Sequence, residues 1–172
     1  MVMEAAGLRL VSVGAGAAAL THRPKLKALP AMRAAGVTHL VTLLSEGEGA
    51  PIIGAAARAA GLEWIWLGLP NAQRPEPPLR DEIAAGLAAL STLIAAGAHV
   101  AVHCSAGIHR TGMFGYALLR TCGLAPEAAM ETLATLRPVT AKGVGDQRLA
   151  WAEELAAAAR QRLDGPASQR VG

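Results

Sequence analysis

The stretch HCSAGIHRTG, residues 103–112, carries the most information about this chain. A valine-rich segment, residues 98–102, precedes it, and a helix-like segment, residues 111–121, follows it. A strand that turns sharply into a helix points several backbone N–H groups and the positive end of the helix at one place. We therefore expect this stretch to form a loop that binds a tetrahedral dianion.

Cys104 and Arg110 stand at the two ends of this loop, separated by five residues. The field that attracts an anion also favours the ionised form of a cysteine side chain, so we expect Cys104 to be a thiolate near neutral pH. Arg110 offers a planar fork that can hold two phosphate oxygens, which a lysine cannot do. A thiolate, a cradle of amides and a bidentate cation together indicate phosphoryl transfer through a cysteinyl-phosphate intermediate.

The pattern His-Cys-x5-Arg-Thr-Gly resembles the signature of the protein tyrosine phosphatase superfamily, and the small dual-specificity branch is the most similar. The resemblance extends over residues 8–155 through the order of the expected elements. It implies a cysteine-dependent phosphatase that needs no metal and no cofactor. It also implies that the following residues bind phosphate, Arg110 through its side chain and the others through backbone N–H groups: Ser105, Ala106, Gly107, Ile108, His109 and Arg110. Gly107 is expected to supply a backbone conformation that a side chain would hinder.

Three further residues have supporting roles if the resemblance holds. His103 orients the loop through hydrogen bonds, or it is an ordinary histidine at the end of a strand. Thr111 eases the departure of the thiolate when the phosphoenzyme is hydrolysed, or it is a first-turn threonine that bonds to backbone. Gln147 positions the attacking water, or it is an exposed residue in the first turn of the last helix.

The group that protonates the leaving oxygen is where the sequence departs from the family pattern. The family supplies an aspartate after the preceding strand, and here Asn71 stands at that position. An amide cannot donate the proton, and general acid catalysis is worth roughly 10²- to 10⁴-fold. Asp81 is the best replacement by position, although an acid at the start of a helix needs no catalytic role. The other candidate donors are Glu46, Glu48, Glu76 and His109.

The expected elements alternate between strands and helices, which predicts a parallel sheet. The expected strands cover residues 8–13, 37–44, 62–67 and 98–102. The expected helices cover residues 24–35, 51–60, 79–96, 110–121, 126–136 and 146–162. We predict an α/β fold with a central, mostly parallel sheet of four to five strands, helices on both faces and a helical C-terminus. A flexible N-terminus (residues 1–7), one phosphatase-like domain (8–162) and a flexible tail (163–172) make up the predicted organisation.

Composition narrows the class of protein. The formal charge of +3 suits an anionic substrate but is too weak to indicate nucleic-acid binding. Two cysteines make a disulfide framework improbable and favour the cytoplasm. No uninterrupted apolar run reaches the length of a membrane span. We expect a cytoplasmic monomer without a membrane or nucleic-acid partner.

The predicted activity is hydrolysis of phosphomonoesters, on a phosphorylated protein (phosphotyrosine, phosphoserine or phosphothreonine) or on a small phosphorylated molecule. A shallow pocket is expected, because the chain is shorter than tyrosine-specific domains, which carry an extra recognition loop. Asn71 leaves a second interpretation open, a catalytically weak pseudophosphatase that mainly binds phosphate. A sulfurtransferase or an arsenate reductase is a third class with a cysteine in an anion-binding loop.

Overall fold

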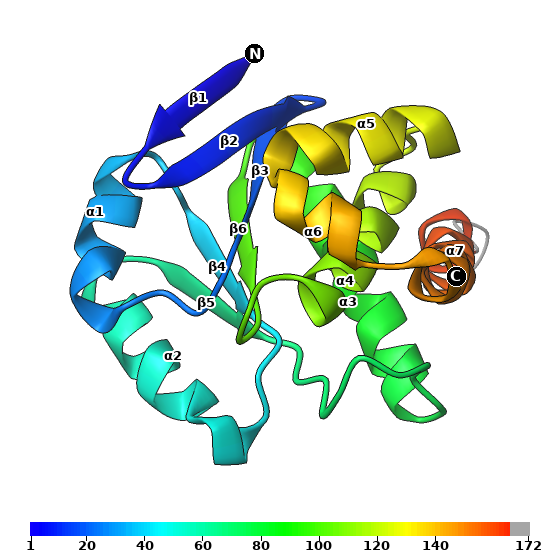
Figure 1. Ribbon diagram of the computed structural model, residues 1–172, viewed down its shortest axis with the longest axis horizontal. Helices are drawn as coiled ribbons and strands as arrows, with labels where there is room; N and C mark the ends of the chain where they lie inside the picture. The colour runs from blue at the N-terminus through cyan, green and yellow to red at the C-terminus, as the bar shows by residue number, and fades with distance from the viewer. Residues whose placement is uncertain (166–172) are drawn as a thin grey trace, which may run out of the picture.

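A six-stranded sheet with helices on both faces forms the centre of the computed structural model, which describes residues 1–165 (Figure 1). The strand order is β1-β2-β3-β6-β4-β5. The strands are β1 (Val2–Ala5), β2 (Leu8–Val13), β3 (Gly16–Thr21), β4 (His39–Thr42), β5 (Glu63–Trp66) and β6 (His99–His103).

The four strands β3, β6, β4 and β5 run parallel, and β1 and β2 add an antiparallel ribbon beside β3. β6 lies between β3 and β4, and His103 at its end pairs with Thr21 on one side and Thr42 on the other. Parallel strands end at the same edge of a sheet, where ligands bind in open α/β folds. The segments that follow these four strands therefore meet at one place.

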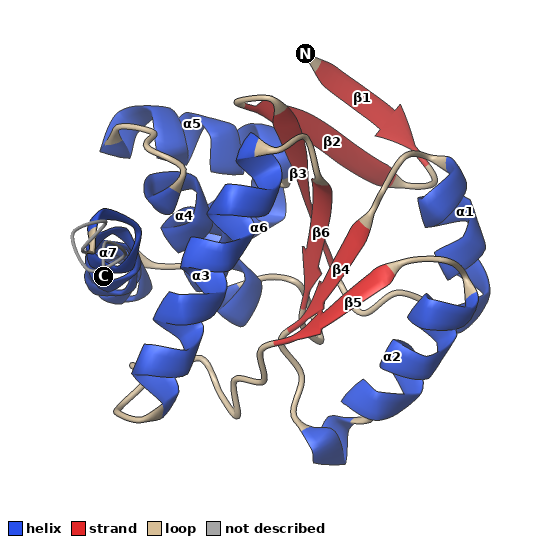
Figure 2. Cartoon of the chain, turned by 180° about the vertical axis from the view of Figure 1, so that it is seen from behind, coloured by secondary structure: helices blue, strands red, loops and turns tan. Residues whose placement is uncertain are grey.

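Helices cover the two faces of the sheet unequally (Figure 2). One face carries α1 (Leu29–Ala34) and α2 (Ala50–Ala59), which follow the short 3₁₀ turns η1 (Leu26–Ala28) and η2 (Glu46–Glu48). The other face carries α3 (Leu79–Ala95), α4 (His109–Thr121), α5 (Pro126–Leu136), α6 (Pro138–Gly143) and α7 (Asp146–Asp164). The predicted α/β class, with helices on both faces and a helical C-terminus, is confirmed.

Two strands were not predicted from the sequence, so the sheet has six strands instead of four to five. β3 is rich in alanine, which is depleted in strands, but an added Cβ at Gly16 would lie 2.3 Å from the carbonyl oxygen of Ala98, so small residues are needed there. β1 pairs with β2 along its whole length, which corrects the expectation of a flexible N-terminus over residues 1–7. Its side chains are largely exposed and show no alternation that would have indicated a strand.

The C-terminal expectation is corrected in part. α7 includes Leu163 and Asp164, which belong to the predicted flexible tail. Residues 166–172 of that predicted tail lie outside the described residues.

Small residues let the elements of this alanine-rich chain approach each other closely. Gly54 of α2 faces the ring of Trp64 in β5, and an added Cβ would lie only 2.6 Å from the ring carbons. The Trp64 ring also stacks on Trp66, with 5.6 Å between ring centroids. Arg58 covers the same indole at 4.9 Å, in cation–π geometry.

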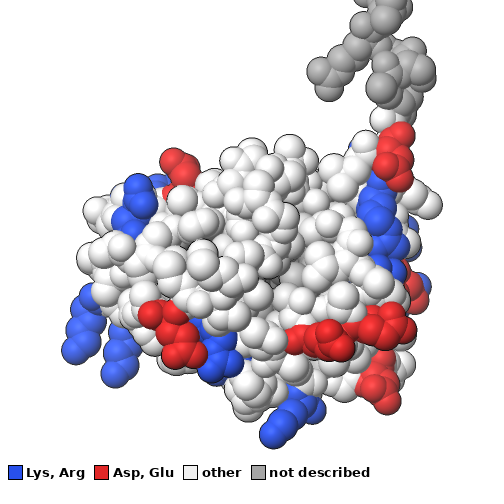
Figure 3. All heavy atoms as spheres, turned by 90° about the horizontal axis from the view of Figure 1, so that it is seen from above, with Lys and Arg blue, Asp and Glu red and all other residues white. Residues whose placement is uncertain are grey.

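Charged side chains are interspersed on the face seen in Figure 3, with basic and acidic groups alternating around its edge and an uncharged centre. This face therefore lacks the continuous basic band that a polyanion would contact. No helix among residues 1–165 is long and apolar enough to cross a bilayer.

The contact between Gly54 and Trp64 yields a prediction about stability. Alanine is favoured over glycine inside a helix by roughly 0.5–1 kcal/mol, but Gly54→Ala would force the indole ring to move. We expect Gly54→Ala to lower the free energy of unfolding by about 1–3 kcal/mol, measured by urea denaturation. Gly47→Ala is the control, because an added Cβ at Gly47 meets nothing within 4 Å. Equal stability of the two variants would contradict this account.

Candidate active site

The loop after β6, residues 104–108, carries the predicted nucleophile to the N-terminus of α4. It borders a pocket of about 240 Å³, here called the Cys104 pocket. The pocket is lined by Pro70, Asn71, Ala72, Cys104, Ser105, Ala106, His109 and Arg110. A larger hollow of about 570 Å³ lies between the β1–β2 turn and the corner of α5 and α6. That hollow includes neither Cys104 nor Arg110, so the smaller one is the candidate active site.

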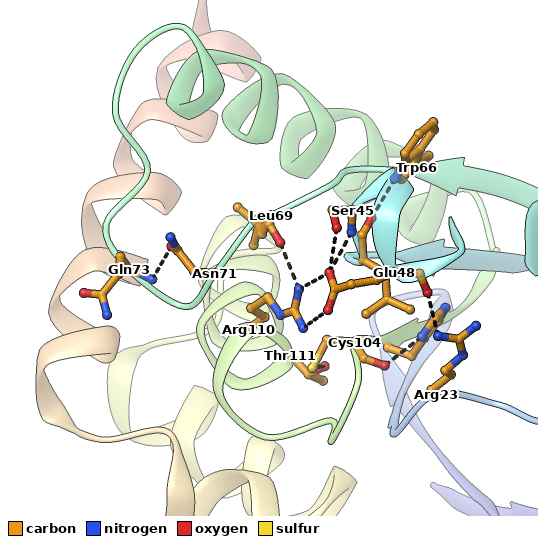
Figure 4. A network of polar contacts seen from close by, with 12 residues as sticks. Arg23, Ser45, Glu48, Trp66, Leu69, Asn71, Gln73, Cys104, Arg110 and Thr111 are labelled. Carbon is orange, nitrogen blue, oxygen red and sulfur yellow. Dashed lines mark hydrogen bonds and ion pairs between the residues drawn. The ribbon is translucent and has the colours of Figure 1, made fainter. Parts of the chain in front are cut away.

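Cys104 lies at the base of the pocket, and only 3% of its surface is exposed. Its Sγ accepts the backbone N–H of Gly107 at 3.2 Å. The hydroxyl of Thr111, drawn beside the sulfur in Figure 4, also donates to Sγ at 3.0 Å. Both donors stabilise negative charge on sulfur. Thr111 is fully buried, and its hydroxyl bonds to sulfur, as expected if it assists the thiolate.

The first two carbonyls of the loop point away from the pocket and are held by other segments. His103 Nδ1 lies 3.0 Å from the Cys104 carbonyl oxygen. The backbone N–H of Arg23, after β3, donates to the Ser105 carbonyl at 2.9 Å. Arg23 also donates through its side chain to the Glu48 carbonyl at 2.6 Å.

The next two carbonyls are held by the corner of α5 and α6. Arg137 Nη1 donates to the carbonyl oxygens of Gly107 at 2.6 Å and Ala106 at 3.3 Å. The hydroxyl of Thr140 donates to the same Gly107 oxygen at 2.5 Å. With every carbonyl from Cys104 to Gly107 turned outward, the N–H groups are left to face the pocket.

Those N–H groups make an anion cradle. Within residues 1–165, no acceptor pairs with the N–H groups of Ser105, Ala106 or Ile108. The N–H groups of His109 and Arg110 open α4, where the first N–H groups have no partner inside the helix. The cradle and the positive end of α4 therefore point to the same place, above Cys104 Sγ.

Gly107 permits this loop conformation. Its φ of +70° lies in the left-handed region, which residues with a side chain rarely adopt. An added Cβ would also lie 2.4 Å from the carbonyl oxygen of Thr21 in β3. Both facts agree with the expectation that a side chain would hinder the loop here.

Arg110 is held by Glu48 of η2. Its Nη1 and Nη2 atoms each donate to one carboxylate oxygen at 2.8 Å, and Nη1 also donates to the Leu69 carbonyl at 3.0 Å (Figure 4). The hydrogen bond from Arg110 lowers the pKa of Glu48 to about 2, assisted by bonds from Ser45. The same pair raises the pKa of Arg110, with the Cys104 charge adding to the effect.

The guanidinium keeps donors for a ligand despite this ion pair. Of its five N–H groups, three are used by Glu48 and Leu69. The other two, Nε–H and one Nη2–H, are adjacent and parallel, so they form a second fork. Arg110 can therefore hold two oxygens of a phosphate while Glu48 keeps it in place.

A buried chain of hydrogen bonds lies behind the nucleophile. Trp64 Nε1 donates to the Thr42 hydroxyl at 2.8 Å, and that hydroxyl lies 2.8 Å from His103 Nε2. Burial lowers the pKa of His103 to about 4, so the imidazole is neutral at pH 7. Because the Cys104 carbonyl can only accept, His103 carries its proton on Nδ1 and accepts from Thr42 at Nε2. Every donor in this hydrogen-bond chain therefore points the same way, from Trp64 toward the loop.

Asn71 lines the pocket at the position where the resemblance led us to expect an acid, but its Oδ1 accepts the N–H of Gln73 at 3.0 Å. The structure does not bring Asp81 into the pocket, which corrects our choice of acid. Asp81 lies in the first turn of α3, half exposed and 3.9 Å from Arg80. The prolines of residues 67–78 extend the chain between Asn71 and this helix, so closeness in sequence does not bring Asp81 to Cys104.

Two other predicted residues keep their side chains away from the pocket lining, although the backbone N–H of Ile108 belongs to the cradle. Gln147 is exposed in the first turn of α7, and its neighbour Arg148 instead donates to the Ala72 carbonyl at 3.1 Å. Ile108 is the N-cap of α4 and contacts Gly143 of α6. The structure brings the other loop residues and His103 together around Cys104.

The sequence interpretation missed four residues that support the loop: Arg23, Thr42, Arg137 and Thr140. Thr42 ends a strand that was predicted, so its place at the ligand edge of the sheet was a usable signal. Arg137 and Thr140 gave no such signal, since they act on the loop from a corner 30 residues away in the chain.

Residues 70–162 match the model of the tyrosine phosphatase family. This match covers more than half of the chain and includes the whole Cys104 pocket. The chain belongs to the tyrosine phosphatase family. A comparison with curated proteins found no match.

Several solved phosphatase structures have the same fold as this protein. Tk-PTP in its active form is 22% identical with a TM-score of 0.64, covering 84% of this chain and 92% of that chain. PTPMT1 is 20% identical with a TM-score of 0.69, covering 91% and 99%. TpbA of P. aeruginosa is 19% identical with a TM-score of 0.59, covering 84% of each chain.

The buried hydrogen-bond chain predicts the effect of changing its central hydroxyl. Thr42→Val leaves the Trp64 N–H and the His103 Nε2 without partners, whereas Thr42→Ser keeps both bonds. We expect Thr42→Val to lower the free energy of unfolding by about 1–3 kcal/mol more than Thr42→Ser does. It should also slow alkylation of Cys104 by iodoacetamide at neutral pH, because the loop loses its support. Equal stability and equal alkylation rates of the two variants would mean that this hydrogen-bond chain does not support the loop.

The two lowered pKa values predict sensitivity to acid. An unfolded histidine binds a proton near pH 6.5, whereas folded His103 resists protonation down to about 4, so stability is lost as the pH falls between these values. For Glu48 the corresponding window runs from about 4.5 down to about 2. We expect the free energy of unfolding to fall throughout this range. Urea denaturation at successive pH values should show a shallower loss below pH 4.5 for Glu48→Gln, and an unchanged slope would contradict the Glu48 assignment.

Proposed function

We propose that this protein is a cysteine-dependent phosphatase that hydrolyses phosphomonoesters through a cysteinyl-phosphate intermediate. The observation that carries the proposal is the position of Cys104 Sγ beneath inward-facing N–H groups, next to the second fork of Arg110. A phosphate bound there presents phosphorus to sulfur. The amides and Arg110 then stabilise the equatorial oxygens as charge develops on them.

The reaction follows in two steps. The Cys104 thiolate attacks phosphorus and forms the S–P bond, and the bond to the leaving oxygen breaks. Water then attacks the cysteinyl phosphate, which releases phosphate and the thiolate. The Thr111 hydroxyl, 3.0 Å from Sγ, donates to the sulfur as it recovers its charge.

The small volume of the pocket supports a broad range of substrates. At about 240 Å³ it accepts a phosphate and part of its leaving group, without a deep slot for an aromatic ring. We propose phosphotyrosine, phosphoserine and phosphothreonine of a protein, or a small phosphorylated molecule, as substrates. A dual-specificity type of activity accords with this shape.

Substitution of the nucleophile tests the proposal. We expect Cys104→Ser to reduce turnover of p-nitrophenyl phosphate by about 10⁴-fold or more, while orthovanadate still binds. Arg110→Lys should reduce kcat/KM by about 10²- to 10³-fold, because an ammonium has no fork.

Cys122→Ser is the matched control. It removes the other cysteine, whose thiol has a pKa raised by burial and which does not line the pocket. Its turnover should equal that of the parent. A parent that binds vanadate without turnover would instead identify a pseudophosphatase, and turnover that survives Cys104→Ser would end the proposal.

A further inference from the structure

Departure of an alkoxide or phenoxide requires a proton, and the pocket lining limits where that proton comes from. Among the residues that line the Cys104 pocket, only Cys104, His109 and Arg110 carry titratable side chains. Cys104 is the nucleophile, and an arginine does not give up its proton in this pH range. His109 is the one remaining lining residue whose side chain can both donate and accept a proton.

Three of the candidate carboxylic acids are paired with arginines: Glu48, Glu76 and Asp81. Glu48 is paired with Arg110, and a pKa of about 2 leaves it without a proton at neutral pH. Glu76 lines a neighbouring hollow and lies 3.6 Å from Arg74. Asp81 lies beside Arg80, outside both lining sets.

His109 has a suitable position for proton transfer. As the first residue of α4, its backbone is part of the cradle, and its exposed side chain borders the pocket mouth. Within residues 1–165 its imidazole makes no hydrogen bond, whereas both ring nitrogens of buried His103 are engaged. The charged groups at the pocket are Arg110, with Glu48 beyond it, and Arg148 of α7, which donates to the Ala72 carbonyl. Cys104 also lines the pocket, and Asn71 faces it from residues 67–78.

We propose that His109 is the general acid and base of this phosphatase, in place of the aspartate that Asn71 replaces. The inference rests on the proposed function. In the first step the imidazolium of His109 gives its proton to the leaving oxygen as the P–O bond breaks, producing an alcohol or phenol. In the second step the neutral imidazole takes a proton from the attacking water as the S–P bond breaks, which regenerates the imidazolium.

Substrates that differ in leaving group test this role. p-Nitrophenolate departs readily without a proton, whereas phenolate is a much stronger base and needs one. We expect His109→Gln to lower kcat/KM for phenyl phosphate by about 10²- to 10³-fold and for p-nitrophenyl phosphate by less than about 10-fold. His39→Gln is the matched control, because His39 starts β4, at the end of the strands away from the pocket. Its kcat/KM for both substrates should equal that of the parent.

A second variant distinguishes the loss of a proton donor from a structural disturbance of the loop. Adding Asn71→Asp to His109→Gln supplies an acid from the other wall of the pocket, and it should restore at least about 10-fold of the lost activity on phenyl phosphate. An equal loss on both substrates, or no loss on either, would overturn the role of His109 while leaving the phosphatase itself intact. A parent inactive on both substrates would overturn the proposed function, and this inference with it.

Discussion

The candidate site depends on one constraint: the four backbone carbonyls of residues 104–107 are hydrogen-bonded on the side away from the pocket. A loop can present its N–H groups to an anion only if its carbonyls are bonded elsewhere, because a buried polar group without a partner is costly. Here the partners come from different segments: His103 in β6, the Arg23 N–H after β3, and Arg137 with Thr140 at the corner of α5 and α6. The fold therefore acts on the loop from outside the pocket.

The sequence was informative about the site where the residues are contiguous, and less so where they meet through the fold. Cys104 and Arg110 could be identified because the strand, loop and helix that position them follow one another in the chain. The partners of the carbonyls could not be identified, since Arg137 has no distinguishing local pattern. Asp81 was chosen by sequence distance, and the proline-rich segment carries it away from the pocket. The alanine-rich strand β3 was missed because close packing, and not strand propensity, decides its conformation.

The sharing of Arg110 between Glu48 and the pocket explains why an arginine stands at this position. One planar group is held by a carboxylate through one fork and can bind phosphate through the other, so the cation is already oriented before a ligand arrives. A lysine would have to leave Glu48 to reach a phosphate. The ion pair also keeps Glu48 ionised, which leaves proton transfer to another side chain.

The stacked indoles of Trp64 and Trp66 provide an intrinsic fluorescence probe of the site. Trp64 begins the hydrogen-bond chain that ends at the Cys104 carbonyl, and Trp66 donates to the Leu44 carbonyl just before the segment that carries Glu48 (Figure 4). Any shift of the loop or of Glu48 on oxyanion binding is therefore transmitted to the surroundings of an aromatic ring. The emission of these two tryptophans should consequently follow occupancy without an added dye, since the third tryptophan, Trp151 of α7, belongs neither to the pocket lining nor to the hydrogen-bond chain.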